Sequence, residues 1–411
     1  MYTELKSCRI CGNTDLQQVL DLGEQTLTGI FPKQRDQEIT RGPLRLLKCT
    51  GSDECCGLLQ LAHSYDLGEM YGENYGYRSG LNASMVRHLN AKVERILKLV
   101  DVSDDSVILD IGSNDGTTLR AYGEQAGQRI GIDPTAEKFR QYYPSGVTIV
   151  PDFFSASLFN KAFPGKKARV VTSFSMFYDL ERPFDFVSEV AAILDQEGIW
   201  VFEQSYMPLM LERNSYDTAC HEHLEYYAIK QIQWMTQRAG LKIVDVEFND
   251  INGGSFSVTV AHRDASYPEF AGLAALCQQE LDAGLDTLAP YQAFADRVSE
   301  NRRVLREFVT NALAQGKRVA CLGASTKGNV LLQYCGFTPE EIIAVGEVNP
   351  DKYGSFTPGT LLPIVPETDF LDNEPDYLIV LPWHFREFFI KNNKLKKGKL
   401  VFPLPNLEII G

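Results

Sequence analysis

A dense polar segment at residues 216–227 has the residue types that proton-transfer chemistry needs. Within its sequence YDTACHEHLEYY, Glu222 stands between His221 and His223, which are two of the six histidines in the chain. Histidine moves protons near neutral pH, and a neighbouring carboxylate can orient the ring and raise its basicity. A metal site and a plain solvated loop are the alternatives, but the segment lacks the helical His-x-x-x-His spacing. We interpret it as a general acid–base group.

A second candidate is the cofactor loop in VILDIGSNDGTTL at residues 107–119, an apolar run that ends in Asp110 and leads through Gly112, Asn114 and Gly116 into a helix. A second apolar run ends in Asp133, where a carboxylate can accept hydrogen bonds from ribose hydroxyls. The spacing lacks the GxGxxG pattern of dinucleotide sites, and a carboxylate at Asp110 would crowd a pyrophosphate. A cationic or zwitterionic nucleoside fits better, and we therefore predict S-adenosylmethionine as the cofactor.

Two other segments provide further candidates for the same pocket. Asp152, Phe153 and Phe154 follow the third run, where an adenine ring would be held, although core packing is an alternative for the two phenylalanines. An aromatic segment that contains Tyr75, Tyr77 and Arg78 could line a small-molecule pocket, since tyrosines combine an apolar ring with a polar tip.

The turn GASTKG at residues 323–328 opens a later helix and includes Ser325 and Lys327. Backbone N–H groups at a helix start bind anions, and a lysine adds positive charge. We interpret the turn as a diphosphate site, with a simple tight turn as the alternative.

Five of the nine cysteines lie within the first 56 residues. Cys8-x-x-Cys11 is the first pair, and Cys49 with Cys56 provides the second. Four thiolates from two such turns bind Zn²⁺ tetrahedrally and leave no open coordination position. Cys56 is preferred to Cys55 because Gly57 follows it and gives the chain room to turn. We predict structural zinc, with free thiols as the alternative.

Alternating patterns indicate how these residues are positioned. From residue 65 to 265, apolar runs at 106–112, 129–134, 147–154, 168–178 and 198–206 alternate with helical patterns at 117–127, 135–143, 183–196 and 230–240. This alternation predicts a doubly wound parallel sheet. The last two runs, 241–250 and 255–264, are joined by INGG, which leaves no room for a helix, so they must pair antiparallel.

The predicted fold class is α/β, with a class I methyltransferase Rossmann-like domain between two other domains. We expect a zinc-binding domain at 1–64, the methyltransferase domain at 65–265, and a helical linker plus a C-terminal Rossmann-like α/β domain at 266–411.

Composition limits the partners. The formal net charge of −14 argues against nucleic acid or an anionic membrane, either of which needs a basic surface. No stretch reaches the length of apolar sequence that crosses a bilayer, and the N-terminus lacks a secretory signal. We expect a cytoplasmic monomer with no nucleic-acid or membrane partner.

The motifs CRICG, CCGLLQL, YGYRSG, VILDIGSNDGTTL, HEHLEYY, INGGSF, GASTKGN, PGTLLPI and FPLP together span nearly the whole chain. In this order they resemble the sugar C-methyltransferases, which add a methyl branch to nucleotide-linked keto sugars. The resemblance implies a zinc domain, an S-adenosylmethionine domain, and a C-terminal domain that helps to bind the nucleotide sugar. It implies methylation at C3 of a 4-keto-6-deoxyhexose through an enediolate.

The resemblance also implies residue roles. His223 would be the base and Glu222 its partner, while His221 would position Glu222 or the sugar. Tyr75 or Tyr77 would contact the sugar or its keto oxygen.

Two departures concern the substrate. Cys220 stands where the family often has Tyr, and Phe177 and Tyr178 replace a region that often contains His. We count Cys220 among the candidate substrate contacts. A nicotinamide-dependent nucleotide-sugar oxidoreductase and a non-catalytic zinc-stabilised scaffold are the alternative functions.

Overall fold

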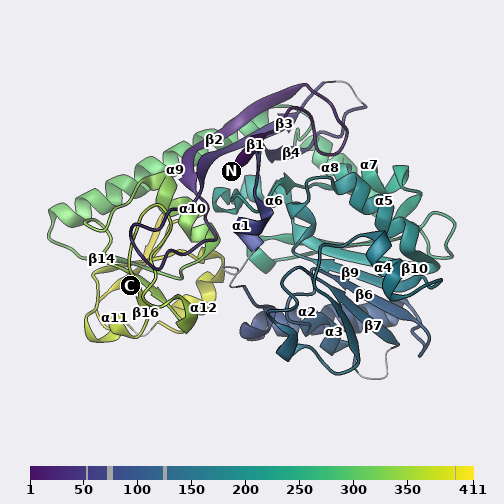
Figure 1. Cartoon of the computed structure of the whole chain (residues 1–411). Coiled ribbons are helices and arrows are strands. Elements are labelled where there is room, and N and C mark those ends of the chain that lie inside the picture. The colour runs from purple at the N-terminus through teal and green to yellow at the C-terminus, as the bar shows by residue number, and fades with distance from the viewer. Residues whose placement is uncertain (52–53, 72–76, 124–126, 394) are drawn as a thin grey trace.

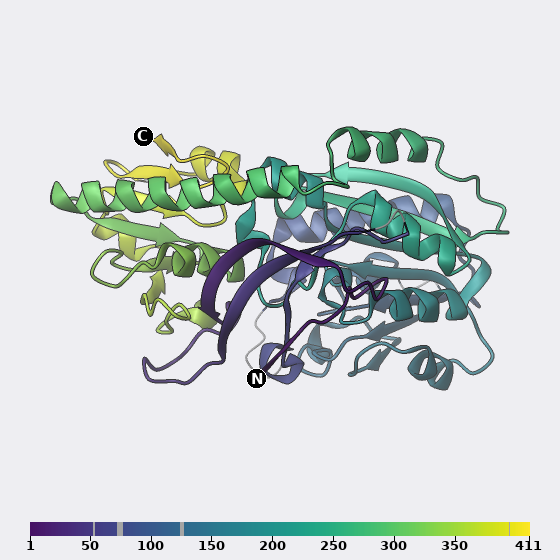
Figure 2. The same cartoon turned by 90° about the horizontal axis from the view of Figure 1, so that it is seen from above.

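The computed structural model describes residues 1–51, 54–71, 77–123, 127–393 and 395–411. Two α/β units lie side by side, and the strands of the N-terminal unit run across both of them (Figure 1). Figure 2 shows these long, curved N-terminal strands beside the junction of the two units. Among the described residues, no helix is long and apolar enough to cross a membrane.

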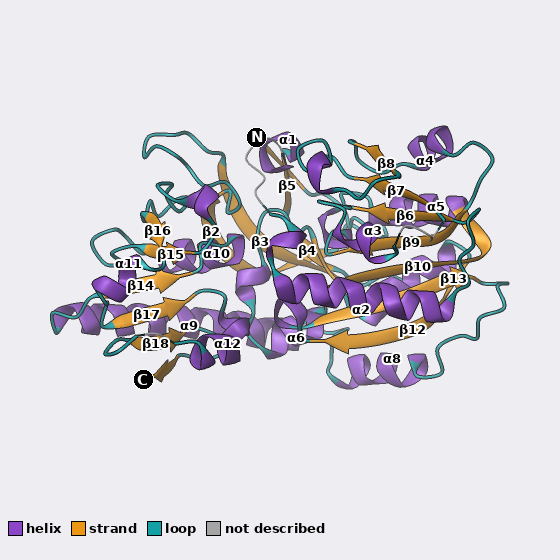
Figure 3. Cartoon of the chain, turned by 90° about the horizontal axis from the view of Figure 1, so that it is seen from below, coloured by secondary structure: helices purple, strands orange, loops and turns teal. Residues whose placement is uncertain are grey.

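The central unit contains a seven-stranded sheet in the order β12-β13-β10-β9-β6-β7-β8. Figure 3 displays this order across the sheet. The pairs among β10, β9, β6, β7 and β8 are parallel, whereas β13 pairs antiparallel with both β10 and β12. This arrangement confirms the predicted parallel sheet with its antiparallel hairpin. The strands are β6 (Val107–Ile111), β7 (Gln128–Ile132), β8 (Val147–Val150), β9 (Ala168–Phe174), β10 (Leu194–Ser205), β12 (Leu241–Asn249) and β13 (Ser255–His262).

The helices of this unit differ from prediction around the cofactor loop. Among the described residues of the pattern at 117–127, the helix α3 spans Thr117–Ala121, and the segment 135–143 forms turns that end in one 3₁₀ turn. Tyr143 explains the second difference, because its hydroxyl lies 2.7 Å from Ser113 Oγ and donates to Asn114 O at 2.8 Å. The other helices are α1 (Leu67–Tyr71), α2 (Ala83–Leu99), α4 (Ala156–Ala162), α5 (Pro183–Ile193), α6 (Met207–Glu212) and α7 (Ile229–Arg238).

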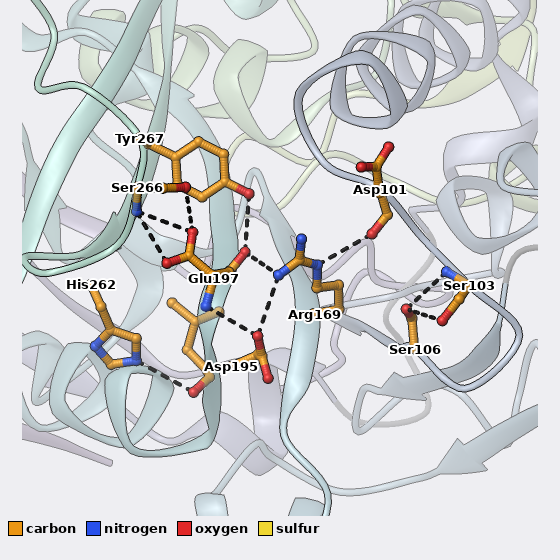
Figure 4. Close-up of polar contacts among 10 residues, drawn as sticks. Asp101, Ser103, Ser106, Arg169, Asp195, Glu197, His262, Ser266 and Tyr267 are labelled. Carbon is orange, nitrogen blue, oxygen red and sulfur yellow. Dashed lines mark hydrogen bonds and ion pairs between the residues drawn. The ribbon is translucent and has the colours of Figure 1, made fainter.

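A polar network ties the segments together at the end of the sheet where β9 begins (Figure 4). Arg169 donates to the backbone oxygens of Asp101 and Glu197, and Tyr267 also donates to Glu197 O. The carboxylate of Glu197 accepts hydrogen bonds from Ser266. Because this network lies at the amino ends of the parallel strands, it leaves their carboxyl ends free to bind ligands.

The N-terminal unit is not confined to residues 1–64. Its four-stranded sheet has the order β11-β4-β3-β2, and β11 comes from the polar segment in the central unit. A hairpin of this sheet also reaches the C-terminal domain, where Asn329 Nδ2 donates to Thr28 O at 2.7 Å. The strands are β2 (Leu16–Thr26), β3 (Arg41–Cys49), β4 (Leu59–Leu61) and β11 (Glu225–Tyr226), beside a separate pair, β1 (Tyr2–Glu4) and β5 (His63–Tyr65).

The C-terminal unit follows two helices, α8 (Leu273–Asp282) and α9 (Ala289–Ala314). Its six-stranded sheet has the order β16-β15-β14-β17-β18-β19, parallel except for β19. The elements are β14 (Val319–Leu322), α10 (Thr326–Cys335), β15 (Val345–Glu347), β16 (Ile364–Pro366), α11 (Asp369–Asp372), β17 (Tyr377–Val380), α12 (Arg386–Lys391), β18 (Lys399–Phe402) and β19 (Glu408–Ile410).

Candidate active site

A cleft of about 1250 Å³ lies where the three units meet. The central unit contributes the carboxyl ends of β6 and β7, the C-terminal unit contributes the start of α10, and the N-terminal unit contributes Gly29 and Phe31. Of the predicted site residues, the following line the cleft: Tyr77, Arg78, Asp110, Gly112, Asn114, Asp133, Phe153, Phe154, Glu222, His223, Ser325 and Lys327.

Gly112 and Asn114 shape the cofactor end of the cleft. Gly112 has φ +69°, and a Cβ there would approach Met176 Cγ to 2.9 Å, so this turn needs glycine. Asn114 accepts a hydrogen bond from Ser79 N at 2.9 Å and donates to Tyr77 O at 3.1 Å. Its amide therefore fastens the Tyr77–Ser79 segment over the cofactor loop.

Two carboxyl groups lie beside this loop. Asp133 Oδ1 accepts hydrogen bonds from both Thr135 N and Thr135 Oγ1 at 2.6 Å, whereas Oδ2 accepts one from Asn114 N at 2.8 Å and keeps a second lone pair for a ligand. Burial and the charge of Asp133 raise the pKa of Asp110 to about 7. A hydrogen bond from Thr172 opposes this shift. A cationic ligand nearby would favour the ionised form of Asp110. The acid-flanked loop thus fits S-adenosylmethionine.

His223 and His221 lie in different surroundings. The Nδ1–H group of His223 donates to Thr218 O at 2.9 Å, because a carbonyl can only accept, and this leaves Nε2 as the basic nitrogen. The Tyr178 ring packs on the imidazole at 4.3 Å between centroids. His221, by contrast, is 1% exposed, packs edge-on against Tyr65, and does not line the cleft.

The ionisation of this group is set by burial. Burial, with the charge of Lys327, lowers the pKa of His223 to about 3, so the imidazole is neutral at physiological pH. Burial raises the pKa of Glu222 to about 7, which a hydrogen bond from the Cys220 thiol partly offsets. The neutral imidazole can accept a proton. Its Nδ1 is held by Thr218 O and not by Glu222, and burial makes it a weaker base than the sequence led us to expect.

Residues of α9 and of the C-terminal unit hold the polar segment 216–227 by hydrogen bonds. Trp383 Nε1 donates to Asp217 Oδ2 at 2.9 Å, and the Tyr216 hydroxyl donates to Asn301 Oδ1 at 3.0 Å. Thr218, whose carbonyl oxygen accepts a hydrogen bond from His223, directly follows Tyr216 and Asp217. None of these partners was predicted, since no local sequence signal connects them.

Lys327 and Lys352 lie at the start of α10, together with the carboxylate of Glu347, which accepts a hydrogen bond from Ala324 N at 2.9 Å. Ser325 caps the helix by accepting from Gly328 N at 3.1 Å, and Lys327 Nζ donates to Asn252 O at 2.9 Å. Lys352 Nζ donates to Ala324 O at 2.7 Å and lies 4.4 Å from the Phe31 ring centroid. Lys352 was not predicted, although it follows β15 at the same edge of the sheet.

Several predicted site residues do not line the cleft. Cys220 is completely buried and meets Glu222 rather than the cleft, because its side chain packs into the apolar core. Gly116 packs against Tyr143, and Asp152 is exposed outside the cleft. Tyr75 lies outside the described residues.

The four predicted zinc ligands converge. Their sulfur atoms lie within 4.8 Å of one another, with 3.4 Å between Cys8 and Cys56 and 3.7 Å between Cys11 and Cys49. Tetrahedral coordination at about 2.3 Å places sulfurs roughly 3.8 Å apart, so the cluster fits Zn²⁺. All four thiols are free, and the ion would be structural.

The strand order, the acid-flanked loop and the ligand-binding edge define a class I S-adenosylmethionine-dependent methyltransferase. Three family models match consecutive parts of the chain: "Putative zinc binding domain" over 8–71, "Methyltransferase domain" over 82–246, and "C-methyltransferase C-terminal domain" over 250–405. The three matches support an S-adenosylmethionine-dependent C-methyltransferase with a zinc-binding domain.

One relative is the C-methyltransferase NovU of Streptomyces niveus, which is 29% identical over 413 residues, covering 99% of this chain and 97% of that protein. Among solved structures, the N-methyltransferase NodS of Bradyrhizobium japonicum overlaps 44% of this chain and 98% of its own, at 13% identity and a TM-score of 0.33. An S-adenosylmethionine-dependent methyltransferase of Clostridium acetobutylicum overlaps 42% of this chain and 90% of its own, at 12% identity and a TM-score of 0.33.

Proposed function

We propose that the protein methylates C3 of a nucleotide-linked 4-keto-6-deoxy sugar. The observation that carries this proposal is the placement of His223 on a cleft that also contains the cofactor loop and the cationic start of α10. An acceptor that must meet all three needs an acidic C–H group at one end and an anionic group at the other. A keto sugar linked to a nucleoside diphosphate has both.

In the proposed reaction, Nε2 of His223 removes the C3 proton, and the electrons of that C–H bond form an enediolate with the 4-keto group. S-Adenosylmethionine, when bound, supplies an electrophilic methyl group. The enediolate carbon forms the new C–C bond as the S–CH₃ bond breaks. His223 then passes its proton to Glu222 or to solvent.

Enediolate charge must be stabilised by nearby donors. Tyr77 lines the cleft and supplies a hydroxyl, and Lys327 supplies positive charge close enough to affect the pKa of His223. Lys352, Ser325 and the free N–H groups of α10 would receive the diphosphate. In a chain with a net charge of −14, these neighbouring lysines favour an anionic ligand.

The experiment is a panel of TDP-, GDP- and CDP-linked keto sugars incubated with S-adenosylmethionine and scored by the mass of the product. We expect a gain of one methyl group on one class of 4-keto-6-deoxy sugar. A thermal-shift titration runs in parallel: stabilisation by S-adenosylhomocysteine supports the proposal, whereas stabilisation by NADH alone would favour an oxidoreductase. Stabilisation by neither ligand would favour a scaffold.

A further inference from the structure

The segment that carries His223 ends as a strand of the N-terminal sheet. Glu225 pairs with Gln60 and Tyr226 with Leu59, in antiparallel register. Leu61 N also donates to Leu224 O at 2.8 Å. The residues that directly follow His223 are therefore held by the zinc-binding unit on one side, while Leu224 N donates to Tyr178 O at 2.7 Å and Met207 N donates to Tyr227 O at 2.8 Å in the central unit.

Arg9 makes the contact between the zinc ligands and this strand. It lies between Cys8 and Cys11, and its guanidinium donates to Leu61 O at 2.6 Å, to His63 O at 3.2 Å and to Ser64 Oγ at 3.0 Å. Its Nε lies 3.7 Å from Glu225 Oε1, and the two side chains are 1% and 0% exposed. The first cysteine pair thus holds a cation against the strand that follows the catalytic histidine.

The second cysteine pair holds the next element. Gln231, in the first turn of α7, donates through Nε2 to Cys56 O at 2.8 Å and to Gly57 O at 3.1 Å. Both halves of the four-cysteine cluster therefore contact the chain within eight residues of His223, at Glu225 and at Gln231.

A buried ion pair is weak evidence for stability, because desolvation offsets its attraction, and its best-attested use is to set a register. A strand that slips by one residue moves about 3.3 Å and turns its side chains to the opposite face. β11 has only two residues, and backbone hydrogen bonds of the flanking residues Leu224 and Tyr227 help to fix its register. The pairing of Arg9 with Glu225 adds a side-chain contact that a slipped register would lose.

We propose that Arg9 and Glu225 are positioning residues, through which the metal-bound cysteine loop sets the register of β11 and hence the place of His223. The proposal rests on the proposed function for the role of His223. It assigns the zinc-binding unit a part in catalysis without contact between the metal and the substrate.

The test compares the full-length wild type with Glu225→Gln, Arg9→Met and the double variant. Asp21→Asn is the control, since it alters an exposed ion pair with Arg45 in the same unit. Displacement of a reacting group by about 1 Å can cost about 100-fold in rate. We expect kcat to fall by roughly 10- to 100-fold in both single variants, with KM and S-adenosylhomocysteine affinity within about threefold of wild type.

The double variant separates positioning from stability. Removing both charges should restore much of the melting temperature that either single variant loses, while kcat stays low because the register is no longer specified. Recovery of kcat together with melting temperature would overturn the proposal, as would a kcat within twofold of wild type in Glu225→Gln.

Hydrogen exchange gives a readout that needs no substrate. In Glu225→Gln, and in wild type stripped of zinc by a chelator, amides of residues 224–226 should exchange faster while those of 107–111 stay protected. Unchanged exchange at 224–226, or equal loss of protection in both segments, would overturn the coupling. Failure of the proposed function appears differently, as a wild type that methylates no keto sugar.

Discussion

The backbone of Gly29 lies against the carboxyl group of Glu222, so closely that a Cβ at Gly29 would overlap Glu222 Oε1. Gly29→Ala should therefore displace the proposed partner of His223 and lower turnover by about 10-fold or more, while S-adenosylhomocysteine affinity stays unchanged. Steady-state kinetics and calorimetry check both. Gly68→Ala is the control, because its Cβ would meet only Asp66 Oδ1, at 3.2 Å. Equal turnover in both variants would contradict the role given to Gly29.

His223→Asn should lose about 10²- to 10⁴-fold in turnover, the usual loss on removing a general base. Cofactor affinity should stay near normal, and exchange of the substrate C3 hydrogen with solvent should disappear. The matched control is His262→Asn, at the far end of the sheet, where Nε2 meets Leu194 O (Figure 4). A His223 variant that still exchanges that hydrogen at the wild-type rate would assign the base to another residue.

His221 should make the fold sensitive to acid. Burial lowers its pKa to about 3, below the unfolded value of 6.5, so the unfolded chain binds the proton more tightly. Above pH 6.5 there is no effect, and below it stability is lost progressively down to about pH 3. His221→Phe should remove this component, which is about 2 kcal/mol at pH 5. Urea unfolding at pH 7 and pH 5 measures it; an equal pH dependence in both proteins would argue against it.

Asp133→Ala should weaken cofactor binding by about 10- to 150-fold, the loss of charge-assisted hydrogen bonds worth roughly 1.5–3 kcal/mol. Calorimetry with S-adenosylhomocysteine measures the change. Asp152→Ala provides the matched comparison, because Asp152 is exposed and does not line the cleft. If the two variants bound the ligand equally well, the cofactor would lie elsewhere.

Zinc analysis should find one equivalent per chain. Cys56→Ser should lose the metal, whereas Cys55→Ser should retain it, because Cys55 is not part of the cluster of four sulfurs. The neighbouring positions make these variants a close control for each other. Retention of a full equivalent by Cys56→Ser would contradict Cys56 as the fourth ligand.

Local sequence patterns were enough to predict the central sheet, the cofactor loop and the cysteine cluster. Asp110 and Asp133 each end an apolar run, so the edge they share follows from strand alternation alone. The cysteines could be grouped because thiols so spaced have few other uses. Each of these signals lies within a short stretch of chain.

The remaining contacts depend on residues far apart in sequence. Nothing near Glu225 indicates that it pairs with Gln60, and nothing near Gly29 indicates that Glu222 will lie against it. The predicted helix at 135–143 does not form, for a similar reason. The tertiary hydrogen bonds of Tyr143 outweigh the local helix propensity. These contacts belong to the assembled protein and have no local signature.

The pairing of β4 with β11 has a consequence for the chain as it leaves the ribosome. At about 5–20 residues per second, β4 is made roughly 10–30 s before its partner strand. During that interval it presents an open edge, which other polypeptides can join. The strand that closes the edge directly follows His223, so a nascent chain loses this route to aggregation in the same step that positions its proposed base.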